Sequence, residues 1–179
     1  MRIISGSRRG KKLFAPVDDR VRPTEDRVKE ALFNILQDVT DLRFLDLFAG
    51  SGQVGIEAIS RGAASATFVD SAADSVALAR RNLALTGFEE SAKVVRSDGA
   101  DYLRRCTETY DIVFLDPPYG AGLLEKVLPL AAECTAPDGV IFCEHPKEAD
   151  LPEEAGSFTK FKVYKYGKIS LTCYRQGNG

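Results

Sequence analysis

The chain is poor in the residues on which several kinds of protein depend. Its 179 residues include no tryptophan, one methionine, one histidine and four cysteines, and no two cysteines form a CxxC pair. A histidine-based metal site or a Ser-His-Asp triad would rest on His145 alone, so we expect neither. No apolar stretch approaches membrane length, and scattered cysteines are typical of reduced thiols in a cytoplasmic protein.

The length and composition favour one compact domain. With 44% hydrophobic residues, a chain of this length can bury one sizeable core. We expect a short basic arm over residues 1–20 and a core over residues 21–179, together forming the single domain 1–179. Nothing in the sequence demands a second chain, so we expect a monomer.

Helix and strand patterns alternate after the arm. We expect strands near 43–47, 66–70, 92–96, 111–115 and 138–143, and helices near 24–37, 53–61, 72–86, 99–106 and 121–134. This alternation is typical of an α/β protein with a doubly wound parallel sheet. The β-rich runs Thr159–Tyr166 and Lys168–Tyr174 meet at Gly167 and predict a hairpin, so the last strand should be antiparallel to the others.

A glycine-rich loop follows the first predicted strand, where residues 44–55 read FLDLFAGSGQVG. Gly50 allows a positive φ and a close approach to a ligand, and Gly55 allows the next helix to pack closely on the strand. The run also matches the GxGxxG pattern of dinucleotide folds, with Asp70 twenty residues after Gly50 as an acid for ribose hydroxyls. The loop alone therefore indicates a nucleotide cofactor of either class.

Two features favour S-adenosylmethionine over NAD. Asp46 lies four residues before Gly50. Its negative charge would attract a cationic cofactor, whereas a loop that binds a pyrophosphate would gain little from it. The second feature is residues 116–119, Asp-Pro-Pro-Tyr, which follow the apolar strand and are called the DPPY motif below. Asp116 and a prolyl carbonyl can accept hydrogen bonds from an amino group, and Tyr119 can stack on a planar base. The alternative is an ordinary strand-ending turn.

These motifs resemble those of a known family. Residues 46–52 resemble the first motif of class I methyltransferases, Asp70 their ribose acid, residues 97–99 their adenine-side loop and the DPPY motif their amino-methylating motif. The segments 2–6, 8–10, 22–24 and 27–36 narrow the resemblance to the bacterial 16S ribosomal RNA guanine-N2 methyltransferase D family, over nearly the whole chain.

The resemblance implies S-adenosylmethionine-dependent methylation of guanine(966) in the small-subunit RNA, on a seven-stranded Rossmann-like sheet with an N-terminal β-hairpin arm. The expected catalytic residues are Asp116, Pro117, Pro118 and Tyr119. The cofactor is expected to contact Thr24, Asp46, Phe48, Ala49, Gly50, Ser51, Gly52, Asp70, Ser71, Ser97, Asp98, Gly99 and Asp116. We expect direct methyl transfer to the amine of an unpaired or flipped-out guanine, without a covalent enzyme intermediate.

The net charge of −2 conceals an uneven distribution of charge. Residues 1–17 contain five basic residues and no acid, and five more basic residues follow Glu154 without an acid. Such patches suit a phosphate backbone. The C-terminal set is either a further RNA contact or a solvated face. We expect a projecting hairpin arm to contact the 16S RNA, within an assembled or assembling 30S subunit, through Arg2, Arg8, Arg9, Lys11 and Lys12, and the core to add Arg22.

Other hypotheses stay open at this stage. Methyltransferases with a motif similar to DPPY methylate adenine N6 in DNA or a glutamine side chain in protein. The basic ends of this chain disfavour a protein substrate. An NAD-dependent oxidoreductase using Gly50 to Gly55, and an RNA-binding module without activity, are two further classes. The roles of Asn34 and His145 are also open. Binding of NAD, of neither cofactor, or of S-adenosylmethionine would distinguish the classes.

Overall fold

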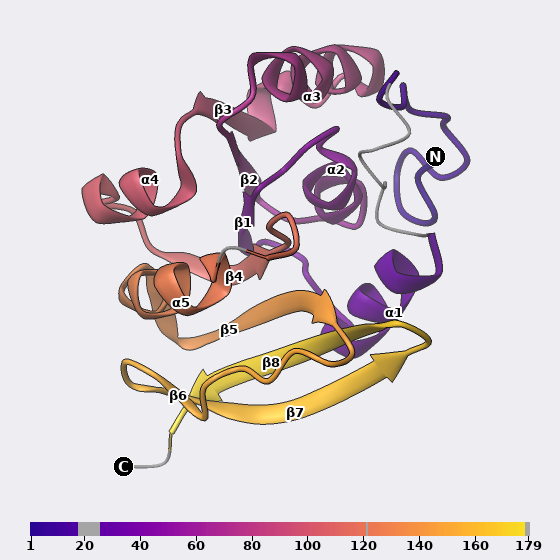
Figure 1. Ribbon diagram of the computed structural model, residues 1–179. Helices are drawn as coiled ribbons and strands as arrows, with labels where there is room; N and C mark the ends of the chain where they lie inside the picture. Colours follow the sequence, from indigo (N-terminus) through magenta and orange to yellow (C-terminus); the bar gives the residue numbers. More distant parts are fainter. Residues whose placement is uncertain (18–25, 121, 178–179) are drawn as a thin grey trace.

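The computed structural model describes residues 1–17, 26–120 and 122–177. Helices and strands alternate as far as β5, and only strands follow (Figure 1). The helices are α1 (Asp26–Leu36), α2 (Gln53–Ser60), α3 (Ala73–Thr86), α4 (Gly99–Arg105) and α5 (Leu123–Glu133), with a 3-10 turn at Glu89–Ser91. The strands are β1 (Arg43–Leu47), β2 (Ser65–Asp70), β3 (Ala92–Arg96), β4 (Tyr110–Leu115), β5 (Thr135–Pro146), β6 (Glu154–Ala155), β7 (Phe158–Tyr166) and β8 (Ile169–Gln176).

The described strands form one sheet in the order β3-β2-β1-β4-β5-β8-β7-β6. The first five strands of this order run parallel, and β8 runs antiparallel to β5, so the predicted hairpin and antiparallel ending are confirmed. The sheet has eight described strands where the resemblance implied seven, because β6 pairs with the start of β7. A strand of two residues leaves no alternating pattern that a sequence could reveal.

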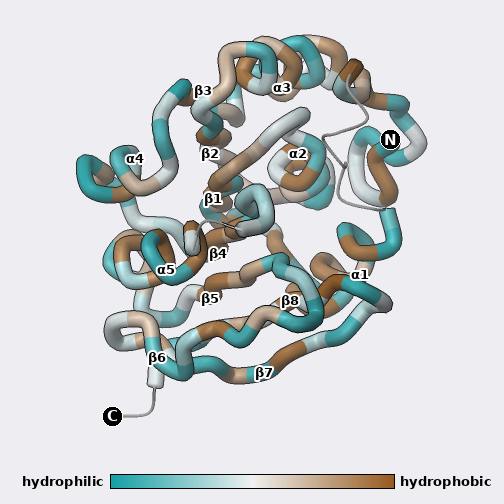
Figure 2. Tube along the Cα trace, in the orientation of Figure 1, coloured by the Kyte–Doolittle hydropathy of each residue, from teal (hydrophilic) through white to brown (hydrophobic). Residues whose placement is uncertain are grey.

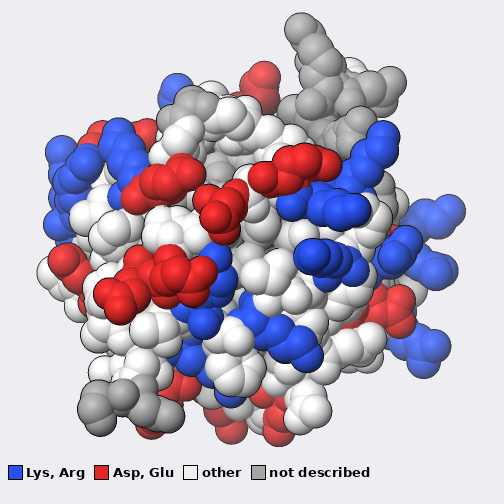
Figure 3. Space-filling view, turned by 60° about the horizontal axis from the view of Figure 1, so that its bottom comes forward, with Lys and Arg blue, Asp and Glu red and all other residues white. Residues whose placement is uncertain are grey.

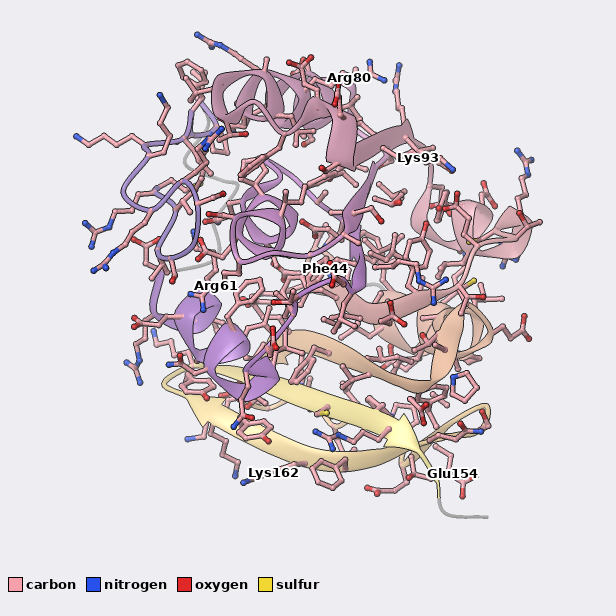
Figure 4. The ribbon with its side chains drawn as sticks, turned by 180° about the vertical axis from the view of Figure 1, so that it is seen from behind. Phe44, Arg61, Arg80, Lys93, Glu154 and Lys162 are labelled. Carbon is pink, nitrogen blue, oxygen red and sulfur yellow. The ribbon has the colours of Figure 1, made fainter. Side chains whose placement is uncertain are left out.

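Helices cover both faces of the sheet (Figure 1). Successive side chains of β1 point to opposite faces, so Phe44 packs with α1, α2 and α3 while Leu45 and Leu47 pack with α4 and α5. Figure 4 labels Phe44 in this interior, and Figure 2 shows the apolar stretches along the inner strands. Because both faces are covered, the parallel strands are apolar on both sides.

The N-terminal arm is a hairpin that packs on the core. Arg2 and Lys12 form an antiparallel bridge, and further backbone hydrogen bonds join the two sides of the hairpin. Ile3 and Leu13 are buried in the cluster formed by α1, α2 and α3. The expectation of a projecting arm is therefore wrong, because these two apolar residues bury its inner side.

A buried carboxylate joins the arm to α2. Glu57 is fully buried and accepts hydrogen bonds from the N–H groups of Ile4 (2.9 Å) and Ser5 (3.0 Å). Its oxygens also lie 2.9 Å from Nε of Arg61 and 3.7 Å from Nζ of Lys29. The arm, α1 and α2 thus share one charge cluster, in which each buried ion compensates another.

Candidate active site at the carboxyl edge of the sheet

The loop after β1 has an unusual backbone conformation. Phe48 follows the strand with φ of 68°, a left-handed value that is uncommon for a residue with a side chain and is frequent at functional sites. Gly50 has φ of 54°, and nothing lies within 4 Å of the place that its Cβ would take. A Cβ on Gly55 would lie 2.4 Å from the Phe68 ring. The positive φ predicted for Gly50 and the close packing of the helix predicted at Gly55 are confirmed, and the approach of a ligand to Gly50 stays a prediction.

Asp46 lies beneath this loop. Its side chain is buried, and Oδ2 accepts a hydrogen bond from the N–H of Gly55 at 3.0 Å, in the first turn of α2. Burial raises the pKa of the Asp46 carboxyl well above its usual range, and the nearby charges of Asp116 and Asp70 raise it further. Asp46 thus holds α2 and adds to a cluster of three acids; its contact with a cofactor stays a prediction.

The predicted ribose acid orders the loop. The two oxygens of Asp70 accept hydrogen bonds from the N–H groups of Gly50 and Ala72, each at 2.9 Å, and its carbonyl accepts one from the N–H of Ser97 at 3.0 Å. A carboxylate has about four acceptor positions, so Asp70 keeps acceptor capacity for hydroxyl groups. One residue therefore connects the ends of β1, β2 and β3.

A pocket of about 120 Å³ opens beside these strand ends. Asp98 caps α4 by accepting a hydrogen bond from the N–H of Asp101 at 3.0 Å, and it lines the pocket from one side. The aromatic and apolar atoms of the lining suit a base, and the acidic groups beside them suit a ribose. The lining residues are Phe48, Val69, Asp70, Ser71, Ser97, Asp98, Gly99, Pro118 and Leu123.

Six of the predicted cofactor residues therefore meet in one pocket, namely Phe48, Asp70, Ser71, Ser97, Asp98 and Gly99. Ala49, Gly50, Ser51 and Gly52 belong to the loop after β1 and do not line the pocket, and Thr24 lies outside the described residues. Leu123, the first residue of α5, was missed because an apolar residue at a helix start carries no chemical signal.

The DPPY motif continues β4 at the same edge of the sheet. Asp116 is half-buried, Pro117 is buried, and Pro118 and Tyr119 are exposed, with Tyr119 at 54%. Pro118 also lines the pocket, so the motif and the pocket share a wall. An exposed tyrosine beside a half-buried acid can receive a planar group from solvent.

Asn82 joins the arm to the glycine loop and was not predicted. The side chain is fully buried; Oδ1 accepts a hydrogen bond from the N–H of Phe14 (2.8 Å), and Nδ2 donates to the carbonyls of Phe14 (3.1 Å) and Ser51 (3.0 Å). One amide therefore holds three segments together. Nothing in the local sequence distinguishes this asparagine from others on a helix surface.

The predicted RNA-contacting residues are spread over the arm. The side chain of Arg8 donates from Nε to the carbonyl of Thr86 at 2.9 Å and lies over the Phe88 ring. Thr86 ends α3, so this part of the arm lies at the amino edge of the sheet, away from the pocket. Arg22 lies outside the described residues. The exposed basic residues of the arm are Arg2, Arg8, Arg9, Lys11 and Lys12.

The hydrogen bonds of His145 indicate a structural role. Its Nε2 lies 2.6 Å from the hydroxyl of Thr172 on β8, and its Nδ1 lies 2.9 Å from the carbonyl of Pro146. Burial lowers the pKa of the imidazole, so the neutral ring joins β5 to β8. Asn34 is exposed on α1.

A larger hollow of about 300 Å³ lies between α1 and the amino ends of β4 and β5. Asp38, Asp111 and Asp138 stand around it among apolar residues, and none of the predicted site residues lines it. We place the site at the smaller pocket, where the loop, the acids and the DPPY motif meet. In the described part of the chain, no group of three His, Cys, Asp or Glu residues could hold a metal ion, and no helix could cross a membrane.

We predict that Asp46→Asn stabilises the protein at neutral pH. The folded-state pKa of Asp46 is raised, so its contribution to stability is complete below the unfolded pKa and is lost as pH rises through the folded pKa. The variant cannot ionise there, and we expect a gain of about 0.5–2 kcal/mol at pH 8 that shrinks toward pH 4. Urea unfolding across this range, with exposed Asp101→Asn as control, measures it; a gain that does not change with pH would contradict the prediction.

Comparisons with known proteins agree with this geometry. The family model described as "Conserved hypothetical protein 95" matches residues 1–175. The protein YlbH of Bacillus subtilis is 37% identical over 182 residues, covering 98% of this chain and 99% of its own. Ribosomal RNA small subunit methyltransferase D of Escherichia coli is 37% identical over 179 residues, covering 98% and 90%.

The solved structure of yhhF from Escherichia coli is 36% identical and covers 100% of this chain and 99% of its own, with a TM-score of 0.88. The fold is thus the Rossmann-like methyltransferase fold that the sequence implied. The chain belongs to the conserved hypothetical protein 95 family and, with it, to the family of the small-subunit ribosomal RNA methyltransferases D.

Proposed function

We propose that this protein is an S-adenosylmethionine-dependent methyltransferase that acts on the N2 amino group of a guanine, guanine(966), in 16S ribosomal RNA. One observation carries the proposal: Pro118 belongs to the DPPY motif and also lines the pocket beside the glycine loop. A methyl donor in that pocket and an amino group at Asp116 would therefore adjoin. The choice of RNA as the substrate is supported by the name of a relative, ribosomal RNA small subunit methyltransferase D.

The residues around the pocket fit S-adenosylmethionine. Asp70 keeps acceptor capacity for ribose hydroxyls, and the Phe48 ring with the apolar atoms of Val69 and Leu123 suits an adenine ring. The charge of Asp70 acts on the nearby Asp46 carboxyl, so two acids lie together beside the glycine loop, which favours a cationic ligand. When bound, this cofactor supplies an electrophilic methyl group on a sulfonium centre.

The DPPY motif holds the acceptor amino group. The carboxylate of Asp116 and the carbonyl of Pro117 accept hydrogen bonds from the two N–H bonds of the amine, which orients the nitrogen lone pair. Two consecutive prolines have no backbone N–H to compete for these acceptors. Asp116 need not be a strong base, because a methylated amine loses its proton readily.

The exposed part of the motif receives the base. Tyr119 can stack on a guanine that has left its helix, which repays part of the stacking lost on flipping. In this proposal the arm and the core act together as one domain and one monomer, in the cytoplasm. We propose that the substrate is the RNA within an assembled or assembling 30S subunit.

Methyl transfer to small ribosomal subunits tests the proposal. Subunits from cells lacking this protein are incubated with radiolabelled S-adenosylmethionine, and the labelled nucleoside is identified after digestion. We expect label in N2-methylguanosine at one site. Label in another nucleoside would overturn the choice of base. An absence of label in subunits, naked RNA and DNA would overturn the proposal that the protein is a methyltransferase. NAD binding, tested in parallel, would favour an oxidoreductase.

A further inference from the structure

Three lysines from two separate segments of the chain meet at one corner of the sheet. Lys147 follows β5, Lys165 lies near the end of β7, and Lys168 lies in the turn between β7 and β8. The N–H of Lys147 donates to the carbonyl of Lys168 at 2.9 Å, which fixes the two segments together. All three side chains are exposed. We call Lys147, Lys165 and Lys168 the basic corner.

The basic corner lies at the same edge as the DPPY motif. Leu115, the residue before the motif, pairs with Cys143 on β5. Three residues farther along β5, Pro146 pairs with Ile169, next to the turn that carries Lys168. Neighbouring strands are about 4.8 Å apart, so β8 and β7 lie roughly 10 and 14 Å from β4. The strand register thus brings the corner level with the motif along the sheet.

The charges of the corner are not neutralised within the described residues. No ion pair joins any of its lysines to an acid in that part of the chain, although Glu148 follows Lys147. Lys160, on the same strand β7, differs because it pairs with Asp150 and Glu153. Figure 3 shows basic side chains in the centre and at the right of the face on which β7 and β8 come forward, with acidic side chains among them and to the left.

Protection of a sheet edge explains only part of this arrangement. Lysines on an exposed edge strand discourage pairing with another chain, which accounts for Lys162 and Lys165 on β7. Lys147 and Lys168 lie outside that strand, so edge protection does not require them. What Lys147 and Lys168 share with Lys165 is a position at the sheet edge that carries the candidate active site.

We propose that the basic corner binds the RNA phosphate backbone next to the target base. The inference rests on the proposed function, which it deepens by naming a second RNA contact besides the arm. The tip of the arm, at Arg8, is held at the amino edge of the sheet, whereas the corner is at the carboxyl edge. RNA bound at the corner therefore enters the site from the β7–β8 side.

A triple variant with a charge-matched control tests the corner. The test variant is Lys147→Gln/Lys165→Gln/Lys168→Gln, and the control is Lys93→Gln/Arg104→Gln/Arg105→Gln, on β3 and α4. Both remove three positive charges from exposed positions, and Figure 4 shows Lys93 at the end of the molecule opposite to Lys162 on β7. Binding to naked 16S RNA and to small subunits lacking the modification is measured at several salt concentrations, apart from activity.

We expect the test variant to bind both RNA probes about tenfold more weakly, with a salt slope smaller by about 2. KM for subunits should rise while kcat at saturation, cofactor affinity and thermal stability stay unchanged. Wild-type affinity in the test variant, or an equal loss in the control, would overturn the inference. Because binding is measured without turnover, an absence of methyl transfer by the wild type contradicts the proposed function alone.

Discussion

Asp116→Ala is expected to reduce methyl transfer by about 10²–10³-fold, the usual effect of removing one preorganised polar contact from a reacting group. The half-buried carboxylate lies at the end of β4, where a prolyl carbonyl beside it is the other expected acceptor for the amine. Without Asp116 the amino group loses one of two hydrogen bonds and its fixed orientation. Fixed-time transfer assays at saturating RNA and cofactor measure this loss in kcat.

Cofactor affinity separates this role from a structural one. Asp70 and Asp98, which line the pocket, are untouched by the substitution, so we expect the dissociation constant for S-adenosylmethionine to change by less than about threefold. Asp116→Asn keeps one carbonyl acceptor and should retain more activity than Asp116→Ala. A large loss of cofactor binding, or equal activity of the two variants, would contradict the assigned role.

Glu57→Ala is expected to destabilise the fold by about 3–5 kcal/mol, the cost of breaking a buried ion pair by removing one partner. The substitution leaves the fully buried Lys29, whose pKa is already lowered by burial, with Asp26 at 3.8 Å as its remaining ion-pair partner among the described residues. It also leaves the N–H groups of Ile4 and Ser5 without their acceptor. Urea unfolding at pH 7 measures the loss.

The double variant Lys29→Met/Glu57→Leu is the matched control. Replacing both ions with apolar side chains removes the uncompensated charge, so we expect it to be more stable than Glu57→Ala. Limited proteolysis should cut the arm of Glu57→Ala first, because Glu57 binds the arm backbone. A loss below about 1 kcal/mol, or an arm as resistant as in the wild type, would contradict this account.

The sequence by itself determined the elements that depend on local pattern. The predicted strands 43–47 and 92–96 match β1 and β3, and the other predicted ends lie within a few residues of the structure. The glycine loop, Asp70, residues 97–99 and the DPPY motif each lie at or directly after the end of a parallel strand, so the topology alone places them at a common edge. Six predicted cofactor residues indeed line one pocket, because the carboxyl ends of parallel strands lie at the same edge of the sheet.

The tertiary structure alone decided what depends on contacts between distant residues. It placed Asp46 under the loop, bound the arm to α2 through Glu57, and used Asn82 to join Phe14 to Ser51. A side chain's burial and partners depend on segments 30 to 70 positions away, which no local periodicity records. For the same reason, only the pairing of β5 with β8 shows that Lys147 and Lys168 lie side by side at the edge that carries the DPPY motif.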